Sequence, residues 1–472
     1  MYNPLKIIDN LAQMVAVKLY RGFYEGGKIT KANKDFWNAT SSFEETAQPD
    51  RDRLRARARW LSGNNAIMDN IDNAIINNVV GKGIYLQSVT GKQKFDDNVE
   101  LNWLRWCKNK NICDITGRFN FFVIQRMLIK SRIVDGEIFI YKIITKDGLK
   151  LQLIETDALD SSRSDGGIET DTYGKPVNYH FIDSTNKAYS IKASSIIHYF
   201  LPERPTQYRG LSEYKQAILD IKNFSAFQSA SIQGARARAN IAYAVKNTGS
   251  GNALGADINT KIQSVNGVSV LYLNKGETIE KLDPDSVATD YAQFSEATIR
   301  SIATARKVSY ELAFRDYSRV NFASSRASLL QDNKRFDFEQ EDFVLNVLND
   351  IFEAWFEVEV LRGTISAPSY EKDPSKYCRP KWIMPKRDLV DPLKEITAIE
   401  KKLKLNLTSE IDVANSEGED YEEILRKKAK ENELKLKYGL PLDENMQNIG
   451  NDVNSKGEPK SYDTNMTGSE KK

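Results

Sequence analysis

The chain has 472 residues, of which 40% are hydrophobic and 28% charged, so it is long enough for roughly two to four folded domains and too apolar to be disordered. Its 67 basic and 65 acidic residues nearly cancel, which argues against a protein that holds DNA by tight neutralisation of phosphates. Three scattered cysteines (Cys107, Cys113 and Cys378) exclude a disulfide framework, and no apolar run reaches the ~18 residues of a membrane span, so we expect an intracellular protein.

The first predicted element is a helix over residues 51–78, which contains no proline and repeats apolar residues at roughly helical spacing. Arginine occupies alternate positions in its first turns, and steps of two residues wind around a helix instead of lining one face. We interpret this run either as a solvated surface with neighbouring acids or as a contact with another subunit or with DNA. The residues assigned to such a contact are Arg53, Arg55, Arg57 and Arg59.

Residues 92–210 mix helices and strands and are predicted to form one α+β domain. Trp103 and Trp106 fall on one face of a helix, and a second helix is predicted over residues 119–134. Short apolar runs separated by glycine-containing turns then indicate strands. Together with a strand that precedes this region, the predicted strands cover residues 84–87, 136–144, 149–155, 177–182 and 195–200.

A small β-containing insert is predicted between two helices in the middle of the chain. The helices are expected at residues 211–233 and 291–314. After a loop of small residues at 249–255, the segments 268–273 and 277–282 are expected to pair as strands. A β insert between two helices indicates a small module carried on a helical stalk.

The longest predicted helix covers residues 324–362, contains neither glycine nor proline, and would measure about 58 Å at 1.5 Å per residue. Its broad apolar face and its length indicate an elongated, packed assembly. Asp391 with Pro392 and, later, Asp420 mark the starts of further helices. After Leu442 the composition becomes polar, which predicts a disordered tail.

Catalytic chemistry has little support in the sequence. The two histidines, His180 and His198, lack the neighbours of a metal cluster or a catalytic triad, and we interpret both as buried or turn residues. Asp135 and Glu137 could bind Mg²⁺, but a turn with one solvent-facing acid is the simpler interpretation. No phosphate-binding loop of the G-x-x-x-x-G-K-[ST] type occurs. We therefore expect no enzyme activity, no cofactor and no metal.

The order of short motifs along residues 50–440 resembles the lambda-type phage portal proteins. In chain order the motifs are RARARWL at 55–61, NVVGKG at 78–83, WLRW at 103–106, DGE at 135–137, QYRGLS at 207–212, NFASSR at 321–326 and DPLKE at 391–395. No single motif is specific, so the resemblance depends on their order and spacing. Thr206 and Asn406 stand where glycine is usual, although asparagine tolerates the left-handed conformation.

The resemblance implies an α+β portal fold with a wing, a helical stem, a small β-containing clip and a helical crown. The implied domains are an N-terminal arm (1–50), the α+β wing (51–210), a helical stem segment (211–244), the clip (245–288), a second stem helix with a channel loop (289–323), a long helix toward the crown (324–364), the helical crown region (365–442) and the disordered tail (443–472).

The implied function is a ring, typically of twelve copies, at one vertex of the virion capsid, through which double-stranded DNA enters and leaves. The ring would assemble in the host cytoplasm. Besides other copies of this chain, the implied partners are double-stranded DNA, bound weakly and without sequence preference, the large subunit of terminase, the major capsid protein and head-completion or adaptor proteins. No membrane partner is implied.

Two sets of site residues follow from the resemblance. A channel loop at about residues 315–326 is expected to contact the DNA backbone weakly, whereas the alternative is that residues 321–325 only cap the following helix. The clip would dock terminase through Asn274 and Lys275. The channel-loop residues are Arg315, Arg319, Asn321, Ser324, Ser325 and Arg326.

Two other functions fit parts of the sequence. One is a Mg²⁺-dependent phage nuclease that would use Asp135 and Glu137 with acids near Glu155 and Asp157. The other is a different structural protein, such as a head–tail adaptor or a capsid subunit. Such proteins usually lack a β insert between two long helices.

Overall fold

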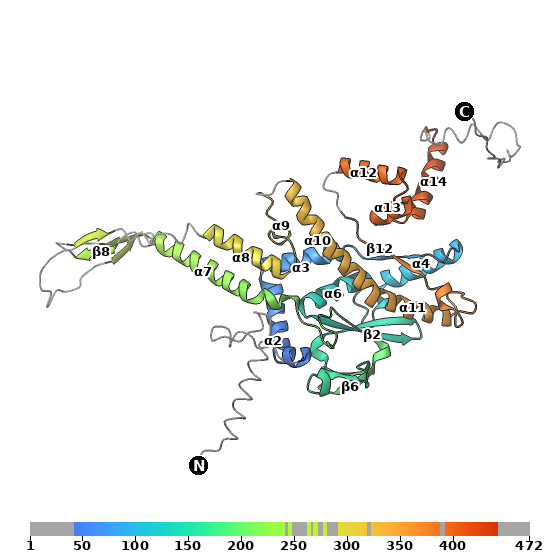
Figure 1. The fold of residues 1–472 in the computed structure, drawn as a ribbon, viewed down its shortest axis with the longest axis horizontal. Coiled ribbons are helices and arrows are strands. Elements are labelled where there is room, and N and C mark those ends of the chain that lie inside the picture. The colour runs from blue at the N-terminus through green and yellow to red at the C-terminus, as the bar shows by residue number, and fades with distance from the viewer. Residues whose placement is uncertain are drawn as a thin grey trace, which may run out of the picture.

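Two helices project from a body of helices and small antiparallel sheets (Figure 1). The computed structural model describes residues 42–240, 244–247, 262–265, 268–271, 277–280, 291–318, 322–387 and 392–441. The predicted disordered tail, most of the N-terminal arm and the predicted site residues Arg319, Asn321, Asn274 and Lys275 lie outside these ranges. Within the ranges, no helix combines the length and apolar character that crossing a membrane would take.

The predicted helix over residues 51–78 is two helices, α2 (Phe43–Asn64) and α3 (Ala66–Val79). The first begins earlier than predicted because Ser42 and Glu45 form a capping box. The prediction of one helix was wrong because Asn65 adopts an extended backbone, and its side chain accepts hydrogen bonds from the first N–H groups of α3.

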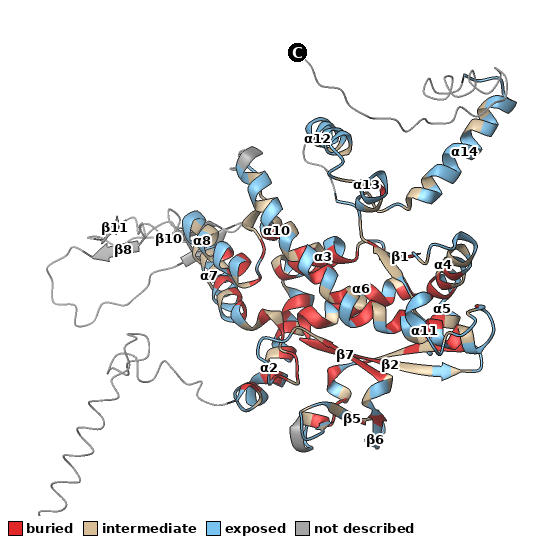
Figure 2. Ribbon diagram, turned by 45° about the vertical axis from the view of Figure 1, so that its right-hand side comes forward, coloured by how far each residue is buried: buried red, intermediate tan, exposed pale blue. Residues whose placement is uncertain are grey.

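Aromatic side chains hold the main core together. Trp103 and Trp106 of α4 (Gln93–Lys108) stack with their ring centroids 4.9 Å apart, which confirms that they share a helix face. Trp103 also meets Phe352 and Trp355 of α11 (Asn349–Leu361) edge-on. The short helix α5 (Lys110–Cys113) and the longer α6 (Phe121–Val134) complete this side, where Figure 2 shows most of the buried residues.

Two three-stranded antiparallel sheets and one two-stranded pair contain the described strands outside the β insert. In the first sheet β2 (Glu137–Thr145) lies between β3 (Gly148–Ile154) and β7 (Ile196–Phe200). The second sheet contains β4 (Ile168–Thr170), β5 (Pro176–Ile182) and β6 (Ala188–Lys192). Phe139 packs against Phe181 between the sheets, with ring centroids 5.4 Å apart. The remaining pair joins β1 (Tyr85–Ser88) to β12 (Pro380–Ile383), which begins 295 positions later in the chain.

Comparison with the predicted strands shows which signals were reliable. The strands predicted at residues 84–87, 136–144, 149–155, 177–182 and 195–200 are confirmed within one or two residues at each end. Five short strands of the described residues were not predicted, namely β4, β6 and β12 and, inside the β insert, Ala244–Asn247 and Ile262–Val265. Each has five residues or fewer, which is too short for an alternating apolar pattern to stand out.

The projecting helices are α7 (Ile218–Asn240) and α8 (Tyr291–Ala305), which lie side by side (Figure 1). Phe227 of α7 stacks on Tyr291 of α8 with ring centroids 5.5 Å apart. A 3₁₀ turn, Glu213–Gln216, leads into α7, and the short helix α9 (Tyr310–Phe314) follows α8. The β insert therefore lies between two packed helices, as predicted.

The pairing predicted inside the β insert was wrong. Strand β10 (Val268–Leu271) pairs with β9 (Ile262–Val265), and β11 (Glu277–Glu280) pairs with β8 (Ala244–Asn247). The sequence between β9 and β10 is Asn266-Gly267, a pair typical of two-residue hairpins. This local signal favours the β9–β10 hairpin and leaves β11 to pair with the strand that follows α7.

The longest predicted helix is continuous but not uniform. It consists of α10 (Phe322–Phe343), a π-helical turn (Val344–Leu348) and α11. Three further helices follow β12, namely α12 (Pro392–Lys404), α13 (Glu410–Ser416) and α14 (Tyr421–Lys437). Asp420 caps α14 as predicted, and Asn406 adopts a left-handed φ of 54° between α12 and α13.

A buried ionic network joins the base of the projecting helices to the body. Asp72 of α3 and Arg306, at the end of α8, are both fully buried and 2.9 Å apart. The Tyr214 hydroxyl donates a second hydrogen bond of 2.6 Å to the Asp72 carboxylate. The ion pair holds the end of α8 against α3, and the Tyr214 hydrogen bond holds the 3₁₀ turn there.

The second half of the network surrounds Arg132 of α6, which is 1% exposed. Arg132 contacts Glu213 and, at 2.5 Å, Glu339 of α10, while Arg335 bonds the same two acids at 2.8 and 2.6 Å. Burial alone would raise the pKa of Glu213, but Arg132 and Arg335 outweigh it and lower the pKa to about 2. The ionic network comprises Asp72, Arg132, Glu213, Arg306, Arg335 and Glu339.

Two glycines allow the chain to cross itself beside this network. A Cβ atom on Gly210 would lie 2.1 Å from the carbonyl oxygen of Gly136, and one on Gly136 would lie 2.3 Å from the backbone of Leu211. Gly136 also has a φ of +96°, which side chains rarely adopt. The connector before α7 can therefore pass directly over the start of β2.

Replacing Gly210 with alanine is expected to lower the free energy of unfolding by about 1–3 kcal/mol or more, because the added methyl group must displace backbone. The matched control is Gly63→Ala in α2, where nothing lies within 4 Å of the new Cβ. That change should stabilise the helix by no more than about 1 kcal/mol. Urea denaturation followed by circular dichroism measures both, and equal midpoints for the two variants would contradict the expected clash.

Candidate functional site

Glu137, at the start of β2, is the most completely bonded acid of the wing. Arg209 donates three hydrogen bonds of 2.6–3.0 Å to its carboxylate, and the Gly210 N–H donates another of 2.8 Å. The imidazole of His198 lies 3.0 Å from the same group. Burial alone would raise the pKa of Glu137, but Arg209 and then His198 outweigh it and hold the pKa well below its ordinary value.

Asp135 is bonded in the same manner, by Arg59 of α2. The two hydrogen bonds measure 2.6 and 2.9 Å. Arg59 also contacts Asp157 at 2.6 Å and Glu155 at 3.6 Å. All four acids that a Mg²⁺-dependent nuclease would use are therefore paired with cationic or imidazole groups.

The interpretation of residues 135–137 as a turn with one solvent-facing acid was wrong. Asp135 is 8% and Glu137 1% exposed, because Arg59 and Arg209 draw both carboxylates inward. Sequence reasoning missed Arg209 as a partner, although it lies within the QYRGLS motif. In the part of the chain that the structure describes, no group of three or more His, Cys, Asp or Glu residues is placed to hold a metal ion.

The four arginines of α2 that were assigned to a contact fall into two pairs. Arg55 and Arg59 form an inner pair with partners in the body, and Arg53 and Arg57 form an outer, exposed pair. Arg55 is buried and contacts Asp52 at 2.8 Å and Asp157 at 3.2 Å, and Arg59 has the partners given above. Arg53 and Arg57 are exposed, with Arg53 bonded only to nearby groups of its own helix. Neighbouring acids thus account for the inner pair, while a contact of these arginines with another subunit or with DNA stays a prediction.

The predicted channel loop begins where α9 ends. Arg315 closes this helix in a left-handed conformation, with φ 56°, and its side chain is exposed. The Ser309 hydroxyl caps the start of α9 and donates a hydrogen bond of 2.6 Å to Asp332 of α10. Asn70 of α3 donates to the carbonyl groups of Leu312 and Ala313. Both α3 and α10 therefore hold the segment from which the loop departs.

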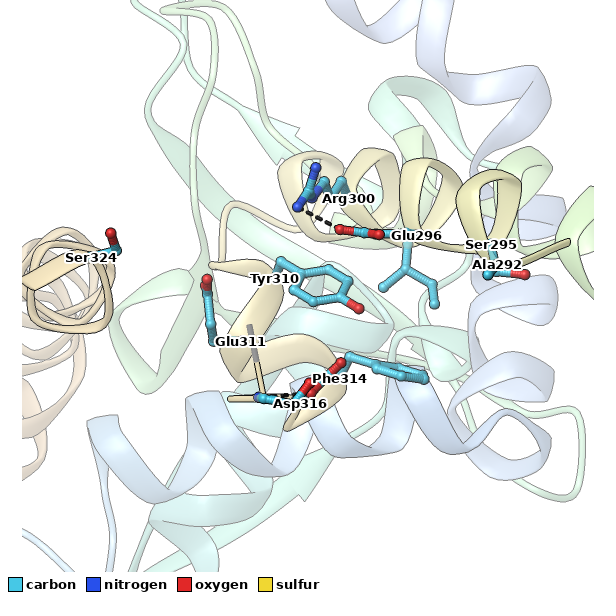
Figure 3. A pocket seen from close by; sticks show the side chains of 11 residues that line it. Ala292, Ser295, Glu296, Arg300, Tyr310, Glu311, Phe314, Asp316 and Ser324 are labelled. Atoms are coloured by element: carbon cyan, nitrogen blue, oxygen red, sulfur yellow. Dashed lines mark hydrogen bonds and ion pairs between the residues drawn. The ribbon is translucent and has the colours of Figure 1, made fainter. Parts of the chain in front are cut away.

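A hollow of about 420 Å³ lies beside this loop, between α8, α9 and the start of α10 (Figure 3). Arg300 bonds Glu296 at 2.6 Å and lies over the ring of Tyr310 at 5.5 Å. The acids Glu311 and Asp316 also line the hollow. Sequence reasoning did not single out any of these residues, since they come from separate segments and form no motif.

Only part of the predicted channel-loop set can be placed. Ser324 is exposed and lines the hollow, Ser325 is half-buried and Arg326 is exposed in the first turn of α10. Arg319 and Asn321 lie outside the described residues. The loop is thus flanked by exposed arginines at residues 315 and 326, and a contact of either with DNA stays a prediction.

Comparison with known proteins gives a family match over most of this architecture. The family model for phage portal proteins of the lambda family matches residues 30–340, which is more than half of the chain. The probable portal protein of Halomonas phage phiHAP-1 is 26% identical over 429 residues, covering 83% of this chain and 82% of that protein. Portal protein B of Escherichia phage lambda is 20% identical over 493 residues, covering 90% and 92%.

Two solved structures that resemble the chain are a neck component and a phage portal protein. A chain from the neck of an empty GTA particle has a TM-score of 0.47 and 14% identity, covering 78% of this chain and 94% of its own length. An HK97-family phage portal protein from Corynebacterium diphtheriae has a TM-score of 0.33 and 11% identity, covering 58% and 84%. From the family match over residues 30–340, we conclude that the chain belongs to the lambda family of phage portal proteins.

Proposed function

We propose that this portal protein forms a closed ring of twelve copies at one vertex of the virion, and that double-stranded DNA passes through the ring during packaging and ejection. The observation that carries the proposal is the family match over residues 30–340, which spans the wing, both projecting helices and nearly all of α10. The ring assembles in the host cytoplasm before it joins the capsid.

Exposed apolar side chains support self-association. A closed ring needs two different, complementary surfaces on each copy, because its contacts are head-to-tail. Large apolar residues are exposed on several helices of the single chain, and neighbouring copies would cover them. On the projecting helices these residues are Leu219, Ile232 and Phe294.

Weak contact with DNA follows from the charge of the chain. The net charge of +2 is small for 472 residues, and α7 has no charged residue between positions 223 and 235. A surface that neutralises few phosphates binds DNA loosely and lets it slide. The channel loop would then supply the main cationic contacts, through Arg315, Arg319 and Arg326.

Other virion and packaging proteins would dock on separate parts of the ring. We assign the large subunit of terminase, and later the head-completion or adaptor proteins, to the clip with Asn274 and Lys275. The major capsid protein would contact the outer side of the wing. The function needs no bond chemistry, and the ion pairs of Asp135 and Glu137 agree with a structural role for these acids.

Mass measurement and negative-stain microscopy of the purified protein test the ring. Twelve copies of 53.6 kDa are expected to give a hollow particle of about 640 kDa. The measurement should be repeated over a range of protein and salt concentrations. A well-folded monomer or dimer under all of these conditions would overturn the proposal.

Reversing the charge of Arg319 and Arg326 to glutamate should reduce the DNA packaged per head by about tenfold, because acidic side chains in the channel loop would repel the phosphate backbone. The matched control is Lys146→Glu together with Lys175→Glu, which makes the same charge change at exposed turns elsewhere in the chain. Nuclease-protected DNA measures packaging, and particle mass checks the ring. Normal packaging, or loss of the ring itself, would count against a channel role.

Changing Glu137 to glutamine is expected to lower the free energy of unfolding by about 3–5 kcal/mol, because Arg209 would stay buried without its counter-charge. Glu155→Gln is the control, since the Glu155 side chain is 73% exposed and 3.6 Å from Arg59. Mg²⁺ should leave the thermal midpoint of the wild-type protein unchanged. Mg²⁺-dependent DNA cleavage that Glu137→Gln abolishes without unfolding would favour the nuclease instead.

A further inference from the structure

One face of α12 is apolar and uncovered. Leu393, Ile396, Ile399 and Leu403 follow one another at steps of three, three and four residues, which places them on one side of the helix. Leu393 is 79% and Ile396 58% exposed, and no residue of α12 is buried. An isolated helix of this length is marginally stable in water, so its apolar face needs a partner. These four residues are called the α12 face.

A second uncovered apolar surface runs along α10 and the π-helical turn. Leu330, Phe338 and Leu345 are 54%, 60% and 59% exposed, and steps of eight and seven residues keep them near one face. The opposite side of α10 is anchored in the body by Phe336 and Phe343, which are buried. Figure 2 shows exposed residues along the outer sides of α10 and α12. Leu330, Phe338 and Leu345 are called the α10 stripe.

The two surfaces match in length and charge. The stripe spans about 22 Å and α12 about 20 Å at 1.5 Å per residue. Lys404 follows Leu393 by eleven positions, and Glu341 follows Leu330 by eleven. Parallel packing that sets Leu393 beside Leu330 therefore brings Lys404 beside Glu341. Lys404 bonds Glu400 of its own helix at 2.6 Å, but both side chains are exposed, so this contact is readily exchanged.

The stripe of the same chain does not cover the α12 face. Arg387, just before α12, contacts Asp337, which is the neighbour of Phe338 in α10. Even with this contact, Phe338, Leu393 and Ile396 remain exposed in the single chain, and Ile399 and Leu403 are only half-buried. A ring supplies a second copy beside each subunit, and its head-to-tail contacts require two different surfaces of this kind.

We propose that the α12 face of one copy packs on the α10 stripe of the neighbouring copy. This inference rests on the proposed ring and names one of the contacts that closes it. The partner is a second copy of this chain, bound through an apolar helix pair with Lys404 and Glu341 at its edge. Each subunit then contacts the next one through α10 and the π-helical turn that follows it.

Cross-linking between single-cysteine chains tests the contact. Cys107 and Cys113 are buried, so a Cys378→Ser background removes the more accessible thiol. Phe338→Cys and Leu403→Cys are placed on separate, differently tagged chains, which are co-expressed and treated with a short bismaleimide. In the proposed packing Phe338 follows Leu330 by eight positions and Leu403 follows Leu393 by ten, so the two lie about 3 Å apart along the helices. The expected product is a pair that carries both tags. In the control, Lys401→Cys replaces Leu403→Cys near the same level of α12 but on its polar face, and the yield should fall by about tenfold.

Particle mass of the same samples separates the two proposals. Rings without the mixed pair would overturn the α12–α10 contact and leave the ring standing. Absence of rings from the untreated wild-type protein would overturn both. A double variant, Phe338→Cys with Leu403→Cys in one chain, that cross-links only within itself would also overturn the contact between copies.

Substitution of the α12 face gives a second readout. Ile396→Asp should lower the fraction of protein in rings by about tenfold at a fixed concentration, a change that corresponds to ~1.4 kcal/mol. Lys401→Asp, on the polar face of the same helix, should leave that fraction unchanged. An equal effect of the two variants, or none from either, would overturn the proposal.

Discussion

The need to pair buried charges dominates the arrangement of this subunit. Arg132 and Arg306 lie in the interior, where an unpaired guanidinium would cost several kcal/mol, so the acids around them must stay within bonding distance. Those acids come from α3, the 3₁₀ turn before α7, and α10. The projecting helices and the long helix are thereby held at one position relative to the wing. Apolar residues of the same volume would make the core at least as stable as these ion pairs do. We therefore attribute to the network not extra stability but the selection of one arrangement of the helices.

Other features of the fold follow from this fixed junction. The connector before α7 reaches the network only by crossing the start of β2, which requires Gly136 and Gly210 at the crossing. Beside the crossing, Arg209 neutralises Glu137, so a second set of buried charges locks the connector onto the wing sheet. On the other side, Ser309 bonds Asp332 one turn before Arg335 along α10. The predicted channel loop therefore departs from a rigid base that the network determines.

Much of the secondary structure could be predicted from the sequence, because apolar spacing and caps are local signals. Two local predictions were wrong. At Asn65 an extended backbone divides a run of helical spacing into two helices. In the β insert, the Asn266-Gly267 pair indicates a hairpin that the predicted strand pairing did not include. Contacts between residues far apart in the sequence could not be predicted from local patterns. Glu137 and Arg209 are 72 positions apart, and nothing near either residue indicates the other. The hollow beside the channel loop was missed for the same reason, since Arg300 and Tyr310 become neighbours only through tertiary packing.

The sequence distances within the ionic network also set an order of events during synthesis. Asp72 bonds Arg306, 234 positions later, and Arg132 bonds Glu339, 207 positions later. A nascent chain that ends before Arg306 carries both N-terminal members without these partners. Only when α10 has been synthesised as far as Glu339 can the ionic network close and the body reach its final packing. Completion of the core therefore waits for the last third of the chain.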